Sequence, residues 1–173
     1  MFHFTLNQTK AMQTLLWMLN RKQGMNVYNI MKVMFTADCY HLTRYGRPIY
    51  GEVYEAWKFG PVPQFMYNLT KIMQNVPYHR CSENCLEANS APDMRVFSET
   101  DIEALEYGMT EFADLPFEAV KDKSHQHRAW KKHEAEIQAG VKNITVDYAD
   151  MIDDQDVLDD LNEFGSLTEN MVF

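Results

Sequence analysis

The 173-residue sequence predicts a mainly α fold: a compact helical bundle with a short β-ribbon or irregular insertion between the second and third helices. Apolar residues recur at helical spacing in several segments, and Gly or Pro separates these segments. Between residues 47 and 63 the helical spacing disappears, and Gly, Pro and aromatic residues take its place. Apolar residues make up 46% of the chain and charged residues 24%, a balance typical of a globular protein.

The first two helices are predicted over residues 7–21 and 26–44. Residues 7–21 carry an amphipathic apolar stripe, and Asn7 is a plausible N-cap because its side chain can accept a backbone hydrogen bond. Residues 26–44 are apolar on nearly every side, so this helix is expected at the centre of the bundle. Gly46 and Pro48 should end it, since Gly permits a left-handed backbone and Pro cannot continue a helix.

The next segments are less regular. Residues 47–63 are expected to form two short extended pieces, followed by an amphipathic helix from residue 63 that ends before Pro77. Residues 78–97 are interpreted as an irregular polar connection with a short strand at 94–97.

A capping-box pattern marks the start of the next helix, because an acid, Asp101, stands three residues after Ser98. A helix should follow it, and a second, short helix should run from residue 117 towards 123. Residues 144–146 are expected to be extended, and an acidic helix is expected over 151–164. We therefore predict one domain over residues 1–150 and an acidic C-terminal segment over 151–173 that is partly helical or frayed.

Charge is distributed unevenly along the chain. Residues 1–142 hold 16 acidic and 16 basic side chains, whereas the residues after Lys142 hold nine acids and no Lys or Arg. A neutral body with an acidic tail lacks the basic footprint of a protein that binds duplex nucleic acid. The tail either keeps the chain soluble or attracts a basic face of a partner.

Composition also bears on location and on metal binding. No apolar run approaches the ~18 residues that a membrane span needs, and the N-terminus does not resemble a signal peptide, so a cytoplasmic protein is expected. His79, Cys81 and Cys85 could supply three metal ligands. A structural zinc site usually has four ligands, so we expect neither a metal nor another cofactor.

Motifs of common enzymes are absent, among them a phosphate-binding loop, a nucleophile elbow and a His-Glu-x-x-His zinc motif. Asp38 and His41 could still support general acid–base chemistry. His125 and His127, with His133 six residues on, invite a metal or nuclease hypothesis. A structural role is the favoured alternative, with Asp38 and His41 bonding neighbouring groups and with His125 and Trp130 anchoring a loop.

An interaction surface is the main functional prediction from the residues themselves. Aromatic side chains flanked by cations are typical of a protein-binding hot spot, although such rings can equally belong to the core under a loop. The expected partner-binding residues are Arg47, Pro48, Tyr50, Tyr54, Trp57, Lys58 and Phe59.

An ordered set of motifs adds a family resemblance. The motifs are Phe35-Thr36-Ala37-Asp38-Cys39-Tyr40-His41-Leu42, then Tyr45-Gly46-Arg47-Pro48-Ile49, then Glu55-Ala56-Trp57-Lys58-Phe59-Gly60-Pro61-Val62-Pro63. This order resembles the Panacea or SocA-like antitoxin domain, and residues 115–130, with Ser124-His125 and Trp130, are similar to its second recognisable block. The resemblance covers most of residues 7–150, and it marks Asp38, His41, Gly46, Gly60, Pro61, His125 and Trp130 as motif residues.

The resemblance implies a helical domain of bacteria, prophages and phages that neutralises a cognate toxin by direct binding, in one case as an adaptor that delivers the toxin to a protease. It implies no enzyme, because the family is not known for a catalytic centre. The Cys81/Cys85 loop and the acidic tail depart from the family pattern. An alternative partner is a host defence protein, which a phage-encoded inhibitor could bind through the same domain.

Overall fold

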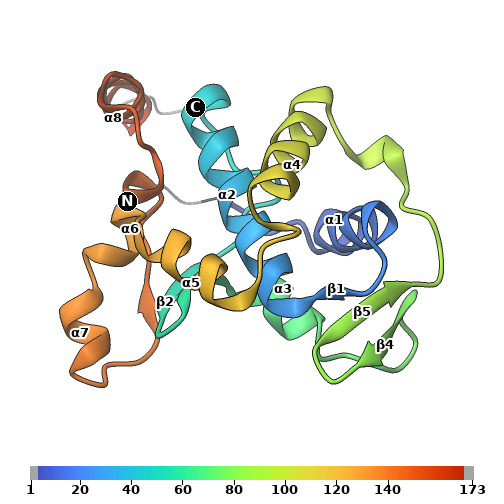
Figure 1. Cartoon of the computed structure of the whole chain (residues 1–173). Coiled ribbons are helices and arrows are strands. Elements are labelled where there is room, and N and C mark those ends of the chain that lie inside the picture. The colour runs from blue at the N-terminus through green and yellow to red at the C-terminus, as the bar shows by residue number, and fades with distance from the viewer. Residues whose placement is uncertain (1–3, 170–173) are drawn as a thin grey trace.

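The computed structural model describes residues 4–169, with their side chains as far as Glu163, and the fold is mainly α (Figure 1). The helices in the described part are α1 (Gln8–Arg21), α2 (Val27–Tyr45), α3 (Gln64–Leu69), α4 (Glu99–Phe112), α5 (Phe117–His125), α6 (Arg128–Lys131), α7 (Glu134–Gln138) and α8 (Gln155–Glu169), with 3-10 turns at Met94–Val96 and Tyr148–Met151. The strands are β1 (Met25–Asn26), β2 (Tyr54–Trp57), β3 (Gly60–Pro63), β4 (Tyr78–Ser82), β5 (Cys85–Ala88) and β6 (Ile144–Thr145). No helix of this part of the chain is long and apolar enough to cross a membrane.

Helix α2 is the centre of the molecule, as its all-round apolar sequence predicts. It packs most extensively against α4 and also contacts β3 and α5. Helix α4 comes close to α2 at Gly108, where an added Cβ would lie 2.5 Å from the carbonyl oxygen of Val33. Asn26 caps the start of α2 by accepting the backbone N–H of Tyr28, and Gly46 ends the helix in a left-handed conformation with φ +69°.

Two three-stranded antiparallel sheets flank the helices. One has the order β1-β5-β4, and the other has the order β3-β2-β6. In the second sheet β2 and β3 form a hairpin with Trp57 opposite Gly60, so Lys58 and Phe59 make its two-residue turn. Strand β6 pairs with the edge of β2 that does not face β3, with Ala56 opposite Ile144. This pairing connects the C-terminal part of the chain to the hairpin.

The core has two clusters. The larger one joins α1, α2, α3 and α4, and the smaller one lies between α2, the β2–β6 pair and the C-terminal segment. Met151 and Ile152 are buried in the smaller cluster, and Val157, Leu158 and Leu161 of α8 pack against it. The described part of the acidic segment is therefore helical over Gln155–Glu169 and docked through an apolar stripe, while residues 170–173 lie outside the described range.

Several predicted boundaries are confirmed. Asn7 accepts the backbone N–H of Lys10 at the start of α1. Ser98 and Asp101 form the predicted capping box, each side chain accepting the backbone N–H of the other. Strand β6 falls within the predicted extended segment 144–146.

Three predictions in the middle of the chain are wrong. The helix after Pro63 ends at Leu69. There the hydroxyl of Tyr78 donates to the carbonyl oxygen of Leu69, and the next residues form a turn with short-range backbone hydrogen bonds. Residues 78–88 form the β4–β5 hairpin in place of an irregular connection. At 94–97 the chain forms a 3-10 turn and not a strand, since Asp93 accepts the backbone N–H of Arg95.

Candidate protein-binding groove

The tip of the β2–β3 hairpin is held by side chains from three different helices. The indole Nε1 of Trp130 in α6 donates to the carbonyl oxygen of Trp57 at 2.7 Å. From α2, Lys32 Nζ donates to the carbonyl oxygen of Pro61 and the Tyr28 hydroxyl donates to that of Phe59, both at 2.7 Å. Helix α5 supplies His125, whose ring lies 3.6 Å from the Trp130 ring, with the two planes 5° apart.

Gly60 is required at this tip for two reasons. Its φ of +103° is a backbone conformation that other residues rarely adopt. In addition, a Cβ at this position would lie 2.5 Å from Ser124 Oγ and 2.9 Å from Lys32 Nζ. The Gly60-Pro61-Val62 motif and the Ser124-His125 motif are therefore parts of one packing contact.

A groove of about 540 Å³ opens beside this hairpin. Aromatic side chains from α2, β2, the hairpin turn, α3 and α5 line it: Tyr28, Trp57, Phe59, Tyr67 and Phe117. The rings contact one another, with centroids 4.7 Å apart for Tyr28 and Phe117, 5.6 Å for Phe59 and Phe117, and 4.9 Å for Trp57 and Tyr67. Phe59 is 44% exposed and Phe117 is 46% exposed. Exposed rings on a fixed scaffold are typical of the anchor residues of protein interfaces.

Two groups that hold the hairpin tip, the buried Lys32 and the half-buried Tyr28, have shifted pKa values. Burial lowers the pKa of Lys32 well below its usual range. Burial also raises the pKa of Tyr28 to about 12, against a hydrogen bond from Ser124 that acts to lower it. Both groups hold the hairpin tip, Lys32 through the carbonyl oxygen of Pro61 and Tyr28 through that of Phe59.

The expected partner-binding residues separate into three groups in the structure. Trp57, Lys58 and Phe59 line the aromatic groove. Arg47 lies elsewhere, where it pairs with Asp101 at 3.1 Å. The surface prediction is wrong for the other three residues, because the structure buries Pro48, Tyr50 and Tyr54.

Asp38 and His41 fasten the segment that follows α2. Asp38 accepts the backbone N–H of Ile49 and the hydroxyl of Tyr54, both at 2.8 Å. The His41 ring bonds the carbonyl oxygen of Arg47 at 2.6 Å and contacts Thr100 Oγ1 at 3.0 Å. Both side chains are fully buried, so neither meets solvent where a substrate could approach.

The pKa of Asp38 is raised to about 7, chiefly by burial, against the two hydrogen bonds, which act to lower it. The carboxyl of Glu52 is likewise buried with a raised pKa, and it accepts the backbone N–H groups of Phe65 and Met66 at the start of α3. Sequence reasoning did not identify Glu52, because the whole β2–β3 hairpin separates it from the start of α3 and only the fold brings the two together.

Two aromatic residues of the groove that lie far from the hairpin in the sequence, Tyr28 and Phe117, were not predicted. Each belongs to a segment remote from the hairpin, and each is brought to it by the packing of α2 and α5. Within residues 4–169 no group of three or more His, Cys, Asp or Glu side chains is arranged to hold a metal ion.

Comparison with known families assigns the chain. Residues 30–131 match the family described as "Antitoxin SocA-like, Panacea domain", which spans more than half of the chain. The chain therefore belongs to this antitoxin-like family, as the motif order predicts. Comparisons with curated proteins and with solved structures gave no match.

Proposed function

We propose that this chain is an antitoxin-type protein that neutralises a cognate toxin by direct protein–protein binding and performs no catalysis itself. The family assignment supports an antitoxin-type role with a protein partner. The aromatic groove supports this location for the partner-binding site, because five rings from separate elements line it. The groove lies beside a hairpin whose carbonyl oxygens accept hydrogen bonds from helix side chains. A preorganised set of rings loses little conformational entropy on binding.

The proposed contact is between the groove and an apolar segment of the toxin. Phe59 and Phe117 are the exposed anchors, and Lys58 stands at the edge of the groove with its ammonium 5.4 Å from the Phe59 ring centroid. Truncation of an anchor ring at an interface typically costs about 2 kcal/mol or more of binding free energy, roughly a 30-fold loss in affinity.

Co-expression tests the role. The product of the gene adjacent to that of this chain should arrest growth when expressed alone, and this chain should restore growth and co-purify with it. The Phe59→Ala and Phe117→Ala variants should lose rescue and bind the toxin at least 10-fold more weakly. Met94→Ala is the matched control, because Met94 is 49% exposed and does not line the groove. Full rescue by both Phe variants would contradict the groove as the binding surface.

Occlusion and delivery to a protease are both compatible with direct binding. Measuring the toxin level during rescue separates them, since occlusion leaves the toxin intact and delivery lowers its steady-state level. In the second case, removal of cellular proteases should restore the toxin level.

A further inference from the structure

Three exposed lysines around the β2–β3 hairpin have no polar partner in the described part of the chain: Lys58, Lys71 and Lys142. Every other lysine donates to a carboxylate, carbonyl or amide oxygen of the chain. The ammonium of Lys58 lies only over the Phe59 ring, and that of Lys71 lies 3.9 Å from the centroid of Tyr67. These three charges are therefore available to a partner.

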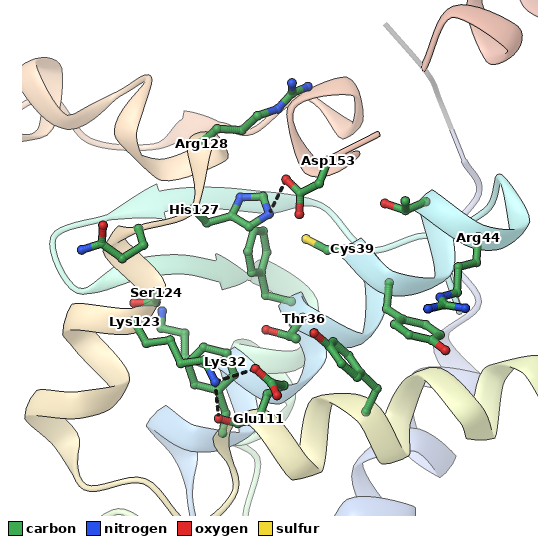
Figure 2. A pocket seen from close by; sticks show the side chains of 16 residues that line it. Lys32, Thr36, Cys39, Arg44, Glu111, Lys123, Ser124, His127, Arg128 and Asp153 are labelled. Atoms are coloured by element: carbon green, nitrogen blue, oxygen red, sulfur yellow. Dashed lines mark hydrogen bonds and ion pairs between the residues drawn. The ribbon is translucent and has the colours of Figure 1, made fainter. Parts of the chain in front are cut away.

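The lysines of the largest cavity are, by contrast, already bonded. That cavity, of about 600 Å³, lies between α2, α4 and the α5–α6 segment (Figure 2). Lys123 donates there to Glu111 Oε2 at 2.6 Å, and the fully buried Lys32 donates to the carbonyl oxygen of Pro61. Lysine ammonium groups without a polar partner therefore gather at the hairpin and not at this cavity.

A second hollow, of about 430 Å³, adjoins the aromatic groove. Ala56, Trp57 and Lys58 of the hairpin line it together with Ile137 of α7 and the loop of residues 140–143. Trp57 and Lys58 line both hollows, so the two form one track across the hairpin. Figure 1 shows α7 and α3, which supply side chains to the two ends of this track, on opposite sides of β2.

The track combines exposed apolar side chains with positive charge. Phe59, Phe117 and Val141 are each 44–49% exposed. Among the described residues, no Asp or Glu lines either hollow, although the chain has 25 acidic side chains against 16 Lys and Arg. The nearby carboxylate of Glu55 is occupied, because it accepts the indole N–H of Trp57 at 2.7 Å. An apolar surface bordered by free cations is complementary to an apolar segment flanked by acids.

The strand beside the track is closed to a further strand. Strand β3 contributes Val62 to the groove, but two of its four residues are Pro61 and Pro63, which have no N–H to donate. The carbonyl oxygen of Pro61 already accepts the side chain of Lys32. An extended peptide therefore has too few backbone partners on β3, and a helix, which bonds its own backbone, fits the track better.

We propose that this track binds an acidic amphipathic helix of the toxin. Apolar side chains on one face of that helix would enter the two hollows, and Asp or Glu beside that face would pair with Lys58, Lys71 and Lys142. This inference rests on the proposed function, because it states which kind of toxin segment the groove receives.

Two synthetic helical peptides of about 18 residues, or five turns, test the charge preference of the full chain. Both carry the same Leu and Phe side chains at positions i, i+3, i+4 and i+7, and they differ only in having Glu or Lys beside this stripe. In fluorescence anisotropy the Glu peptide should bind saturably with a Kd of about 100 μM or tighter, and the Lys peptide about 10-fold more weakly or worse. The Kd of the Glu peptide should rise with salt, since the paired charges are exposed.

Charge reversal locates the site. Lys58→Glu combined with Lys142→Glu should weaken binding of the Glu peptide about 10-fold or more and should tighten binding of the Lys peptide. Arg44→Glu combined with Arg95→Glu is the matched control, because it changes the net charge equally at exposed positions that line neither hollow. No saturable binding of the Glu peptide, equal affinity for the two peptides, or equal effects of the two double variants would overturn the proposal.

The same double variants in the co-expression test separate this inference from the proposed function. If Phe59→Ala loses rescue while Lys58→Glu with Lys142→Glu keeps it, the groove binds the toxin but not through an acidic helix. If both Phe variants keep full rescue, the proposed function itself fails. Sedimentation of the full chain should show a monomer; a dimer that the Lys58→Glu, Lys142→Glu variant abolishes would mean that a second copy occupies the track, and would overturn the proposal.

Discussion

The indole nitrogen of Trp130 donates a 2.7 Å hydrogen bond to the carbonyl oxygen of Trp57, and this bond joins residues 73 positions apart in the sequence. Trp57 precedes the hairpin turn, and Trp130 lies in α6 with the His125 ring stacked on its own. The two sequence blocks of the family thus meet at the hairpin tip, which is also the wall of the aromatic groove.

Replacing Trp130 by Phe should test this bond. The substitution keeps a ring but removes the Nε1–H donor to the part-buried carbonyl oxygen of Trp57, and the loss of one hydrogen bond typically costs about 0.5–1.5 kcal/mol. Urea denaturation should show a loss of unfolding free energy in that range, and toxin binding should weaken because Trp57 lines the groove. An unchanged midpoint would mean that the bond contributes nothing to stability.

Gly60→Ala should destabilise the protein more than a glycine substitution in an open turn. Both the positive φ and the contacts with Ser124 and Lys32 oppose a methyl group at Gly60. Gly140→Ala is the matched control, since Gly140 also has a positive φ, +85°, but nothing lies within 4 Å of its added Cβ. Strain alone costs about 1–2 kcal/mol, and overpacking adds about 1–3 kcal/mol at Gly60. Equal losses of unfolding free energy in the two variants would show that the hairpin tip accommodates the methyl group without further destabilisation.

Asp38 should make stability depend on pH. Its pKa in the folded state, about 7, lies above the ordinary value of a carboxyl, so the folded protein binds the proton more tightly than the unfolded chain. Its contribution to the unfolding free energy should therefore fall as pH rises from about 4 to 7, and then stay constant. Asp38→Asn removes this titration. Compared with wild type, its thermal midpoint should decline less over that pH interval, and parallel curves would contradict the assignment.

The C-terminal segment should contribute to stability mainly through residues 146–152. A chain that ends at Asp154 loses α8 but keeps the buried Val146, Met151 and Ile152, whereas a chain that ends at Asn143 loses all of these. Burial of one large apolar side chain is worth about 1.5–3 kcal/mol. The chain ending at Asn143 should therefore melt well below the chain ending at Asp154, and thermal denaturation of both gives the comparison. Similar midpoints would show that the β6 segment and the residues up to 152 are dispensable for the core.

Local sequence chemistry determined the mainly α fold, the central place of α2 and several boundaries. Asn7, Gly46 and the Ser98–Asp101 capping box act within one helical turn, so their effect can be read from neighbouring residues alone. The ordered motifs also carried the family assignment. The β4–β5 hairpin was missed because its turn, Glu83-Asn84, has no Gly to mark it.

Only the tertiary structure decided which residues form a surface. Tyr50, Tyr54 and Phe59 all belong to one aromatic segment, yet the first two are buried and the third is exposed. Sequence spacing does not separate them, because burial depends on what packs from elsewhere: α2 and the C-terminal segment cover Tyr54, whereas Phe59 stays 44% exposed among the described residues. Tyr28 and Phe117 join the groove for the same reason, since contacts between distant segments form only when the whole chain has folded.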